Sequence, residues 1–361
     1  MILLGSTGSI GVNALNIARE FGLSVEALSA GENVELLNKQ IKEFKPKYVS
    51  VLKKELIPLV NHDSVFWGEE GVLEILDLAK SESVVNALVG FAGLKPTIKS
   101  LRDGKKLALA NKESLVVAGA FVDNSKITPI DSEHFGIWYL LNGRKVDSIT
   151  ITASGGAFRD TPLEMISKMS AKEALNHPNW KMGKKITIDS ATMANKLFEL
   201  LEAKWLFGVD NLNAVIERNS LIHALVNFVD GSTVAHFAGA DMRLPISFAL
   251  LDGKVEKNIV SPVDLLGIKE IRFEEILKDR YPIWEIKDDI LAHPKRGVVV
   301  NAANEVAVKA FLDGDMGFLD IPKVILKAYK KFEDIELNSF EDIFEVDKEV
   351  RIYSTKEVKK C

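Results

Sequence analysis

Over the first 130 residues, short apolar runs alternate with longer stretches of helical periodicity. The runs ILLG, VEALSA, KYVSVL, SVVNALVG and KLALAN each stop at a glycine, an asparagine or a charged residue. Between the first two runs, Ile10, Ala14, Ile17, Ala18 and Phe21 recur on one face of a helix. This alternation predicts an α/β fold, with an N-terminal domain over residues 1–130 built on a doubly wound, Rossmann-like parallel sheet.

The pattern changes after residue 130. The segments KVDSITITASGGAF, KITIDSATMANKLFELLEAKWLFG and NAVIERNSLIHALVNFVDGSTVAHFAG read as longer strands with few helices between them, so we expect an α+β catalytic domain over residues 131–253. Residues 254–283 contain proline and little periodicity, which indicates a linker. NAANEVAVKAFLDG and DIPKVILKAYKKF have helical apolar faces, so residues 284–361 are predicted to form a C-terminal helical domain.

A glycine turn, GSTGSIG at residues 5–11, joins the first predicted strand to the first predicted helix. A phosphate binds well at such a turn, because the helix dipole favours an anion and glycine permits its close approach. The spacing is G-x-x-G-x-x-G, a weaker dinucleotide signal than G-x-G-x-x-G, and a turn without a ligand is the competing interpretation. Gly31, Glu32 and Asn33 end the second predicted strand, where a residue that contacts the ribose is expected.

Composition narrows the class of protein. The chain has 361 residues, 47% hydrophobic and 27% charged, as expected for a globular protein of two or three domains. Its 46 basic and 51 acidic residues give a net charge of −5 without a basic run, which argues against nucleic acid and favours a small-molecule partner. The single cysteine, Cys361, excludes an intramolecular disulfide. With no apolar run near 20 residues and a first strand expected from residue 2, we expect a cytoplasmic protein without a membrane span or leader.

Two acidic residues, Asp131 and Glu133, follow an apolar run in ITPIDSEHFGIW. In an extended segment both carboxylates would point to one side, and oxygen ligands favour Mg²⁺ or Mn²⁺. The competing interpretation is a solvated turn. A third ligand is expected from DSATMANKLFELL, where Asn195, Lys196 and Glu199 share one helical face. An exposed helix with an ordinary lysine–glutamate pair would explain that face equally well.

Three further segments carry candidate chemistry. Asp189 or Ser190 is a candidate N-cap after a strand KITI, and Ser154 precedes a glycine pair, which favours either an oxyanion site or a plain turn. Residues 177–184 form a loop between a helix and a strand that either surrounds a buried Trp180 or closes as a lid. His223 lies in an apolar strand, where a histidine with satisfied hydrogen bonds in the core is the default.

Eight motifs then occur in a characteristic order: GSTGSIG, ALANKESLV, PIDSEH, ASGGAF, HPNWKMG, DSATMANK-x-x-E, DMRLPI and NAANE. Together they resemble the 1-deoxy-D-xylulose 5-phosphate reductoisomerase family across essentially the whole chain. The resemblance implies a metal- and NADPH-dependent isomerisation and reduction of 1-deoxy-D-xylulose 5-phosphate to 2-C-methyl-D-erythritol 4-phosphate, in the non-mevalonate isoprenoid pathway. It also implies Mg²⁺ or Mn²⁺ as the metal, a small phosphorylated sugar as the substrate, and a homodimer.

The resemblance also implies roles for individual residues. The NADPH site would comprise Thr7, Gly8, Ser9, Ile10, Gly31, Glu32, Asn33, Asn111, Glu113 and Gly183. The metal ligands would be Asp131, Glu133 and Glu199, of which the two glutamates also bind the substrate. The catalytic residues would be these three together with Lys112 and His177. The substrate phosphate would be held by Ser154, Ser190, Asn195 and Lys196. Ser132, Lys112 and His177 would contact the carbonyl and hydroxyl end of the substrate, while Trp180 and Met182 cover it from the loop over residues 177–184.

One position departs from the family pattern, and three other classes of protein need to be considered. Glu32 stands where the family usually has a basic residue, and an acid there is typical of NAD sites; NADPH remains the expected cofactor because Asn33 is retained. An aspartate-semialdehyde-type dehydrogenase is excluded because it needs an internal cysteine nucleophile. A metal-independent NAD(P)-dependent sugar oxidoreductase stays open. A nucleotide sensor without chemistry would leave Asp131, Glu133 and Glu199 without a purpose.

Overall fold

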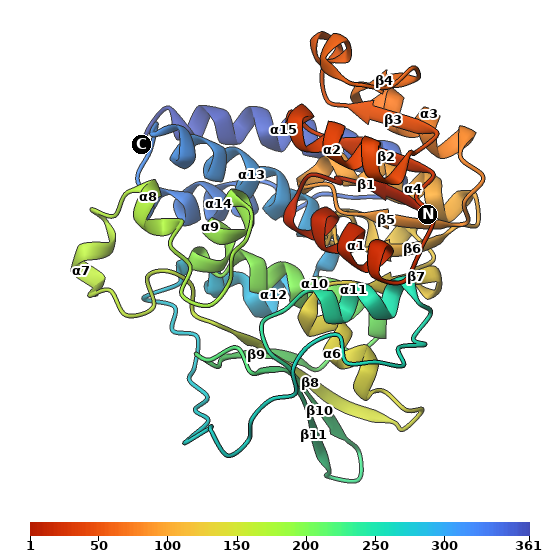
Figure 1. Ribbon diagram of the computed structural model, residues 1–361. Coiled ribbons are helices and arrows are strands. Elements are labelled where there is room, and N and C mark those ends of the chain that lie inside the picture. The colour runs from red at the N-terminus through yellow and green to blue at the C-terminus, as the bar shows by residue number, and fades with distance from the viewer. The chain divides into compact units, whose positions relative to one another are not determined.

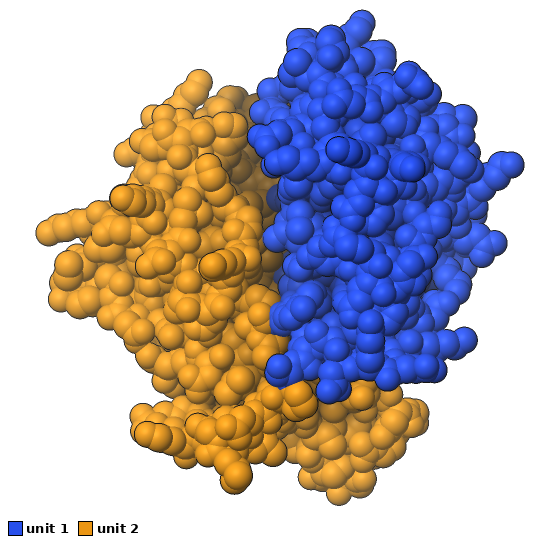
Figure 2. Space-filling view, viewed as in Figure 1, with its two compact units in different colours: residues 1–114, 122–135, 241–261 blue, residues 115–121, 136–240, 262–361 orange.

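A computed structural model describes residues 1–361, which form two compact units (Figure 2). Unit 1 consists of Met1–Ser114, Val122–Phe135 and Asp241–Ser261. Unit 2 consists of Leu115–Phe121, Gly136–Ala240 and Pro262–Cys361. Both units therefore combine segments that are distant in the sequence, and the four predicted domain ranges stay predictions.

Unit 1 is built on a sheet of seven parallel strands (Figure 1). The strands are β1 (Ile2–Leu4), β2 (Ala27–Ala30), β3 (Tyr48–Val51), β4 (Val65–Trp67), β5 (Ser83–Asn86), β6 (Lys106–Leu109) and β7 (Ile127–Pro129), in the order β4-β3-β2-β1-β5-β6-β7. Because the order reverses beside β1, the predicted doubly wound fold is confirmed. The two edge strands, β4 and β7, were not predicted, because each has only three residues, β4 is only partly buried and β7 ends at Pro129.

The helices of unit 1 connect and cover these strands. They are α1 (Ser9–Glu20), α2 (Val34–Phe44), α3 (Gly68–Leu78), α4 (Leu94–Arg102) and α11 (Arg243–Leu250), and α5 (Glu113–Ala118) and α6 (Ser132–Leu140) begin in this unit. The predicted apolar face of α1 is confirmed, since Ala14, Ile17 and Ala18 are buried. Helix α11 comes from much later in the chain and packs against α1, where Ile246 joins the hydrophobic core.

Unit 2 contains a mixed sheet of four strands in the order β11-β10-β8-β9. The strands are β8 (Val146–Ala153), β9 (Leu212–Ile216), β10 (Ile222–Phe228) and β11 (Thr233–Phe237); β10 is antiparallel to β8 and β11, whereas β9 is parallel to β8. Its other helices are α7 (Leu163–Ile166), α8 (Ala171–Ala174), α9 (Lys184–Thr192), α10 (Ala194–Phe207), α12 (Lys287–Ala292), α13 (Gly297–Asp313), α14 (Asp320–Lys331) and α15 (Phe340–Val358). Residues 131–253 contain more helices than their sequence pattern predicted.

The C-terminal helices confirm the expected helical region. The two predicted helices correspond to α13 and α14, and both pack with α15, which was not predicted. Helix α15 begins with a capping box formed by Ser339 and Asp342 and buries Ile343 and Val350. None of the helices combines the length and the apolar character that crossing a membrane requires.

Short 3-10 helices and one irregular segment complete the fold. The 3-10 helices are η1 (Lys54–Leu59), η2 (Gly90–Gly93), η3 (Gly119–Phe121), η4 (Asn124–Lys126), η5 (Pro282–Ile286) and η6 (Pro294–Arg296). Between α11 and η5 the only regular pairing is an isolated bridge between Ile216 and Glu274. This irregular stretch covers most of the range in which a linker was expected.

The segment KITI is not a strand, as predicted, but the start of α9. Its β-branched residues alternate as in a strand, yet helical contacts decide its conformation. Thr187 Oγ1 donates to Gly183 O one turn back at 2.8 Å, and Lys185 pairs with Asp189 at 2.7 Å with helical i,i+4 spacing. Asp189 and Ser190 therefore lie in the last turn of α9 rather than at a helix N-cap.

The glycine turn over residues 5–11 leads to a prediction that substitutions at Gly11 and Gly8 differ in their effect on stability. A Cβ on Gly11 would lie 2.3 Å from Gly5 O, and backbone atoms cannot move aside. We expect Gly11→Ala to lower the free energy of unfolding by about 2 kcal/mol or more. Gly8→Ala is the matched control, because its Cβ would lie at an ordinary 3.5 Å and the change should cost less than about 1 kcal/mol. Urea unfolding of both variants tests this, and equal stabilities would contradict it.

Candidate active site

The predicted phosphate turn has the geometry of an anion site in unit 1. Gly5, with φ +85°, follows β1, and its N–H and that of Ser6 donate to Ser29 O at 3.1 and 2.8 Å. Helix α1 begins after Gly8, and no side chain caps its first N–H groups. The N–H of Gly8 donates to Gly5 O at 3.1 Å, whereas Ser9, the first residue of the helix, is exposed. The turn therefore fits the pyrophosphate of a dinucleotide.

The end of β2 lies beside this turn, because β1 and β2 pair in parallel register. Asn33 is the N-cap of α2, and its Oδ1 accepts from Leu36 N at 3.1 Å. Glu32 forms an ion pair with Lys53 at 2.5 Å, and both side chains are more than half exposed. The acid that departs from the family pattern is thus charge-compensated by a lysine that sequence analysis did not consider.

Asn111, predicted to lie near the nicotinamide, makes several hydrogen bonds within the protein. Its Nδ2 donates to Leu88 O at 2.9 Å, to Gly90 O at 2.8 Å and to Glu113 Oε2 at 3.2 Å. Its Oδ1 accepts from the N–H of Ser114 at 3.2 Å. The side chain therefore ties the loop after β5 to the start of α5, and it also orients Glu113, another predicted cofactor residue.

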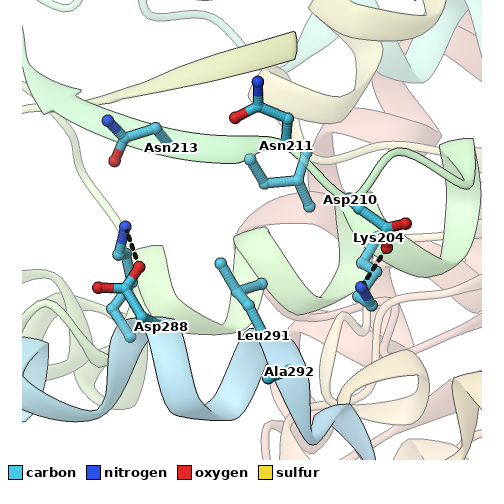
Figure 3. A pocket seen from close by; sticks show the side chains of 9 residues that line it. Lys204, Asp210, Asn211, Asn213, Asp288, Leu291 and Ala292 are labelled. Carbon is cyan, nitrogen blue, oxygen red and sulfur yellow. Dashed lines mark hydrogen bonds and ion pairs between the residues drawn. The ribbon is translucent and has the colours of Figure 1, made fainter. Parts of the chain in front are cut away.

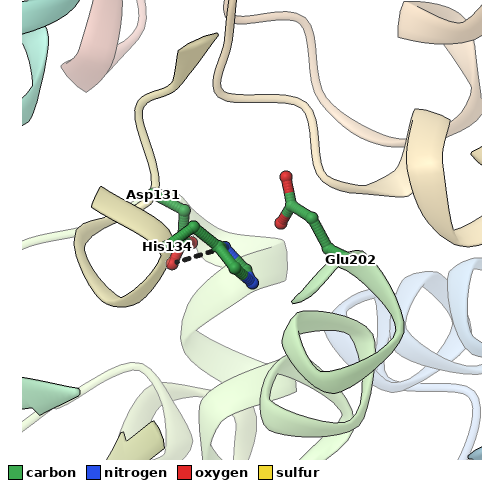
Figure 4. Close-up of side chains that lie close together, drawn as sticks. All are labelled: Asp131, His134 and Glu202. Atoms are coloured by element: carbon green, nitrogen blue, oxygen red, sulfur yellow. Dashed lines mark ion pairs between the residues drawn. The ribbon is translucent and has the colours of Figure 1, made fainter. Parts of the chain in front are cut away.

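Lys112 and Asp131 form a buried ion pair at the carboxyl end of the sheet. Lys112 follows β6 and Asp131 follows β7, and these strands are parallel neighbours. Lys112 Nζ lies 2.5 Å from Asp131 Oδ2, and His134 Nδ1 lies 3.4 Å from Asp131 Oδ1 (Figure 4). Burial alone would raise the pKa of Asp131, but the charge of Lys112 and the contact with His134 hold that pKa well below its usual range. Asp131 is therefore a carboxylate.

The predicted extended geometry of Asp131 and Glu133 is wrong, because α6 begins at Ser132. Asp131 precedes the helix, and its Oδ1 accepts from the N–H of Glu133 at 3.3 Å. Ser132 Oγ donates to Glu133 Oε2 at 2.5 Å. Asp131, Ser132 and Glu133 still lie within one helical turn. They are neighbours because a helix begins there, and not because the segment is extended.

In unit 2, three predicted residues meet at one imidazole. His177 Nε2 lies 3.0 Å from Ser154 Oγ and 3.1 Å from Ser190 Oγ. Ser154 directly follows β8, and Ser190 belongs to α9. Gly156, with φ +70°, makes the approach possible, because a Cβ there would lie 2.7 Å from Ser190 O and 2.6 Å from Ala191 Cα. The predicted glycine turn thus holds Ser154 and Ser190 together.

The protonation of His177 follows from its hydrogen bonds. Nδ1 accepts the backbone N–H groups of Asn179 at 3.1 Å and Trp180 at 2.9 Å, so the neutral ring carries its proton on Nε2. Burial first, and then the charge of Arg159, lower the pKa of His177 to about 4. At neutral pH this side chain is an uncharged donor toward Ser154 or Ser190.

Helix α10 brings Asn195, Lys196 and Glu199 together, as the helical spacing predicted. Asn195 Nδ2 donates to Glu199 Oε1, and Lys196 Nζ donates to Glu199 Oε2. The exposed-helix interpretation is wrong, since Lys196 is 4% and Glu199 only 1% exposed. A carboxylate so deeply buried needs several donors, and these two side chains supply them.

The loop over residues 177–184 joins α8 to α9, not a helix to a strand as predicted. Asn179 anchors it, because its Nδ2 donates to Arg218 O and Ser220 Oγ, both at 2.7 Å. The Trp180 ring meets His223 edge-on with centroids 6.2 Å apart, while Met182 is half-buried. His223 is the predicted core histidine, with Nε2 3.2 Å from Ala238 O.

Several residues that shape the site were missed by sequence analysis. His134 lies inside the motif PIDSEH, three residues after Asp131, and this helical spacing was the available signal. Arg159 donates to Ser154 O and Arg218 O, both at 2.8 Å, and so connects the glycine turn to the strand end. No local pattern indicated Arg159, because its partners lie far apart in the sequence.

A separate pocket of about 570 Å³ lies in unit 2 (Figure 3). Side chains of β9, α12 and the end of α10 line it, among them Lys204, Asp210 and Asp288. Lys204 pairs with Asp210 at 2.5 Å, and Lys287 pairs with Asp288 at 2.7 Å. None of the predicted site residues lines this pocket.

The doubly wound sheet with its glycine turn, together with buried carboxylates, lysines and a histidine, defines an enzyme of the dinucleotide-binding α/β class. The family profile "1-deoxy-D-xylulose 5-phosphate reductoisomerase" matches residues 1–119, and two profiles for C-terminal domains of the same enzyme match residues 127–207 and 237–353. A protein of that name from Nautilia profundicola is 56% identical over 97% of this chain and 98% of its own length. The chain therefore belongs to the 1-deoxy-D-xylulose 5-phosphate reductoisomerase family.

Further similarities agree with this assignment. The protein of that name from Wolinella succinogenes is 54% identical over 99% of this chain and 100% of its own. A crystal structure of DOX-P reductoisomerase with NADPH, fosmidomycin and magnesium superposes with a TM-score of 0.93 at 33% identity, covering 99% of this chain and 98% of the other. The Zymomonas mobilis enzyme in complex with NADPH gives a TM-score of 0.88 at 33% identity, covering 100% and 99%.

The neutral state of His177 can be measured directly. Its ¹⁵N chemical shifts, followed between pH 4 and 8, should show a proton on Nε2 and no titration midpoint above about pH 5. Because its folded pKa lies below the ordinary 6.5, its contribution to stability is complete above pH 6.5 and is lost as the pH falls toward 4. A His177→Asn variant assigns the signal. A midpoint near 6.5 would contradict the burial argument.

Proposed function

We propose that this protein converts 1-deoxy-D-xylulose 5-phosphate to 2-C-methyl-D-erythritol 4-phosphate, using NADPH and a divalent metal ion. The observation that carries the proposal is Glu199, a carboxylate with 1% exposure on α10, beside two of the predicted phosphate-binding residues, Asn195 and Lys196. A core helix that served structure alone would gain little from burying this charge. Membership of the family supplies the reaction.

NADPH fits unit 1. The open N-terminus of α1 would receive the pyrophosphate through Thr7, Gly8, Ser9 and Ile10. Gly31, Glu32 and Asn33 would lie toward the adenosine ribose, with Asn111 and Glu113 toward the nicotinamide and Gly183 also beside the cofactor. When bound, NADPH supplies the hydride that reduces a branched aldehyde phosphate to the product.

A hard divalent cation fits the available carboxylates. We assign it to Asp131, Glu133 and Glu199, a set of oxygen donors with the chemistry that Mg²⁺ or Mn²⁺ prefers. A second candidate set replaces the two glutamates with His134 and Glu202. The all-oxygen set suits a hard cation better than one that contains an imidazole. When bound, the ion polarises the substrate carbonyl and stabilises negative charge on oxygen.

The chain's own side chains would bind and orient the substrate. Ser154, Ser190, Asn195 and Lys196 are proposed to hold the phosphate. His177 contributes an uncharged Nε2–H at the two serines, so it can donate without changing the local charge. Binding at the phosphate orients the reacting end, so losing this grip should lower turnover as well as affinity.

Lys112, Ser132 and the loop over residues 177–184 would bind and enclose the reacting end of the substrate. Lys112 is held by Asp131 at 2.5 Å and is 4% exposed, so its ammonium is fixed in place before substrate binds. Closure of the loop with Trp180 and Met182 over the substrate would exclude water, which strengthens the attraction between Lys112 and a developing oxyanion.

We also propose that the protein is a cytoplasmic homodimer. The family resemblance supports the dimer, and the single, exposed Cys361 is compatible with a reducing compartment. Sedimentation equilibrium measures the mass of the assembly directly. We expect a dimer, with twice the 39.9 kDa of one chain.

The first experiment measures NADPH oxidation at 340 nm with 1-deoxy-D-xylulose 5-phosphate, in Mg²⁺ and in excess chelator. We expect oxidation that stops when the metal is removed and resumes when it is restored. Oxidation that persists in chelator would favour the metal-independent sugar oxidoreductase. A folded protein that binds NADPH but never oxidises it would favour a nucleotide sensor.

A second prediction concerns the proposed metal ligand on α10. Glu199→Gln keeps the shape of the side chain but removes a charge, so we expect activity to fall at least about a hundredfold. Asp210→Asn is the control, since this side chain pairs with Lys204 of the same helix but is 91% exposed. Near-normal activity of the Glu199 variant at saturating Mg²⁺ would refute the assignment.

A further inference from the structure

An ion pair that the proposed reaction does not use lies just past the carboxyl ends of the neighbouring strands β2 and β3. β2 and β3 are parallel neighbours, with Ala30 opposite Val51. The pairing continues past the strands, because Leu52 N donates to Gly31 O at 3.4 Å. The next residue in each segment is Glu32 or Lys53, and their side chains meet at 2.5 Å.

Charge at this edge distinguishes the two nicotinamide cofactors. In doubly wound folds an acid at the end of the second strand accepts the ribose 2′-hydroxyl of NADH, and a cation nearby receives the 2′-phosphate of NADPH. A phosphate monoester carries about −1.5 to −2 charges at pH 7, so a lone carboxylate would repel it. In this chain the acid follows β2 and the cation follows β3, and the two side chains are in direct contact.

We propose that Lys53 is the residue that recognises the 2′-phosphate, and that Glu32 weakens the discrimination between NADPH and NADH. This inference rests on the proposed function, because it assumes that unit 1 binds a nicotinamide dinucleotide. The specificity-determining cation would then come from the loop after β3 and not from the position after Gly31. Exposure supports this role, since both side chains are more than half exposed and available to a ligand.

The other cation near this position is less suited. The Nζ of Lys54 lies 5.2 Å from the centroid of the Trp67 ring, so its charge already makes a cation–π interaction. The hydrogen bond that Lys53 donates to the Glu32 carboxylate raises the pKa of Lys53, so the ammonium remains charged. A 2′-phosphate that approaches the pair would share Lys53 with Glu32, and the carboxylate would oppose part of the attraction.

The test is cofactor binding without substrate, measured by nicotinamide fluorescence for NADPH and NADH. Lys53→Gln should lower the ratio of Kd(NADH) to Kd(NADPH) by about fivefold to tenfold, the size of one charge-assisted hydrogen bond, and leave Kd(NADH) nearly unchanged. Glu32→Gln should raise the ratio by about threefold, because the repulsion is gone. Lys39→Gln is the matched control, since Lys39 forms a similar exposed ion pair with Glu35 at 2.7 Å.

Each outcome decides between explanations. If the wild-type protein binds neither cofactor, the proposed function fails and this inference fails with it. If the wild type binds NADPH but Lys53→Gln leaves the ratio within twofold, only the role of Lys53 is overturned. If Glu32→Gln leaves the ratio unchanged or lowers it, the opposing role of Glu32 is overturned.

Discussion

The proposed active site depends on burying charged carboxylates beside lysines. Removing an ion from water costs several kcal/mol, so a buried charge without a partner would destabilise the fold. Asp131 has Lys112 and His134, and Glu199 has Lys196 and Asn195. The fold supplies each partner differently: two loops after adjacent parallel strands in one case, and one helical face in the other. The surrounding turns and helices hold these groups in contact.

His177 provides a buried hydrogen-bond donor without adding a charge. Two backbone N–H groups fix its tautomer, and burial keeps the ring neutral. The result is a donor placed between two serine hydroxyls on a strand end and a helix. A cation in the same place would pull the two serines toward itself and would compete with Lys196 for an anionic ligand. A neutral ring leaves Lys196 as the positive charge among the proposed phosphate residues.

Much of the fold was predictable because the central strands are buried on both faces and read as continuous apolar runs. The edge strands β4 and β7 were too short to stand out; β4 is also partly exposed, and β7 ends at a proline. KITI was misassigned because its alternation mimics a strand, whereas helical contacts such as the pairing of Lys185 with Asp189 decide its conformation. The motifs identified Asp131 and Glu133, but their geometry depends on where α6 begins. Lys53 was missed because Glu32 is remote from it in sequence, and Arg159 because it joins Ser154 to Arg218, which lie far apart in the chain.

The position of α11 has a consequence for how the chain is made. All seven strands of unit 1 have been synthesised by residue 129, yet the unit also requires residues 241–261. Ile246 of α11 and Ile259 belong to the same core as Leu3 and Ala14. A growing chain therefore carries a sheet whose core is incomplete for more than a hundred residues of translation. Completion of the core of unit 1 therefore waits for the synthesis of about half of unit 2, and no cut between residues 136 and 240 releases a complete unit 1.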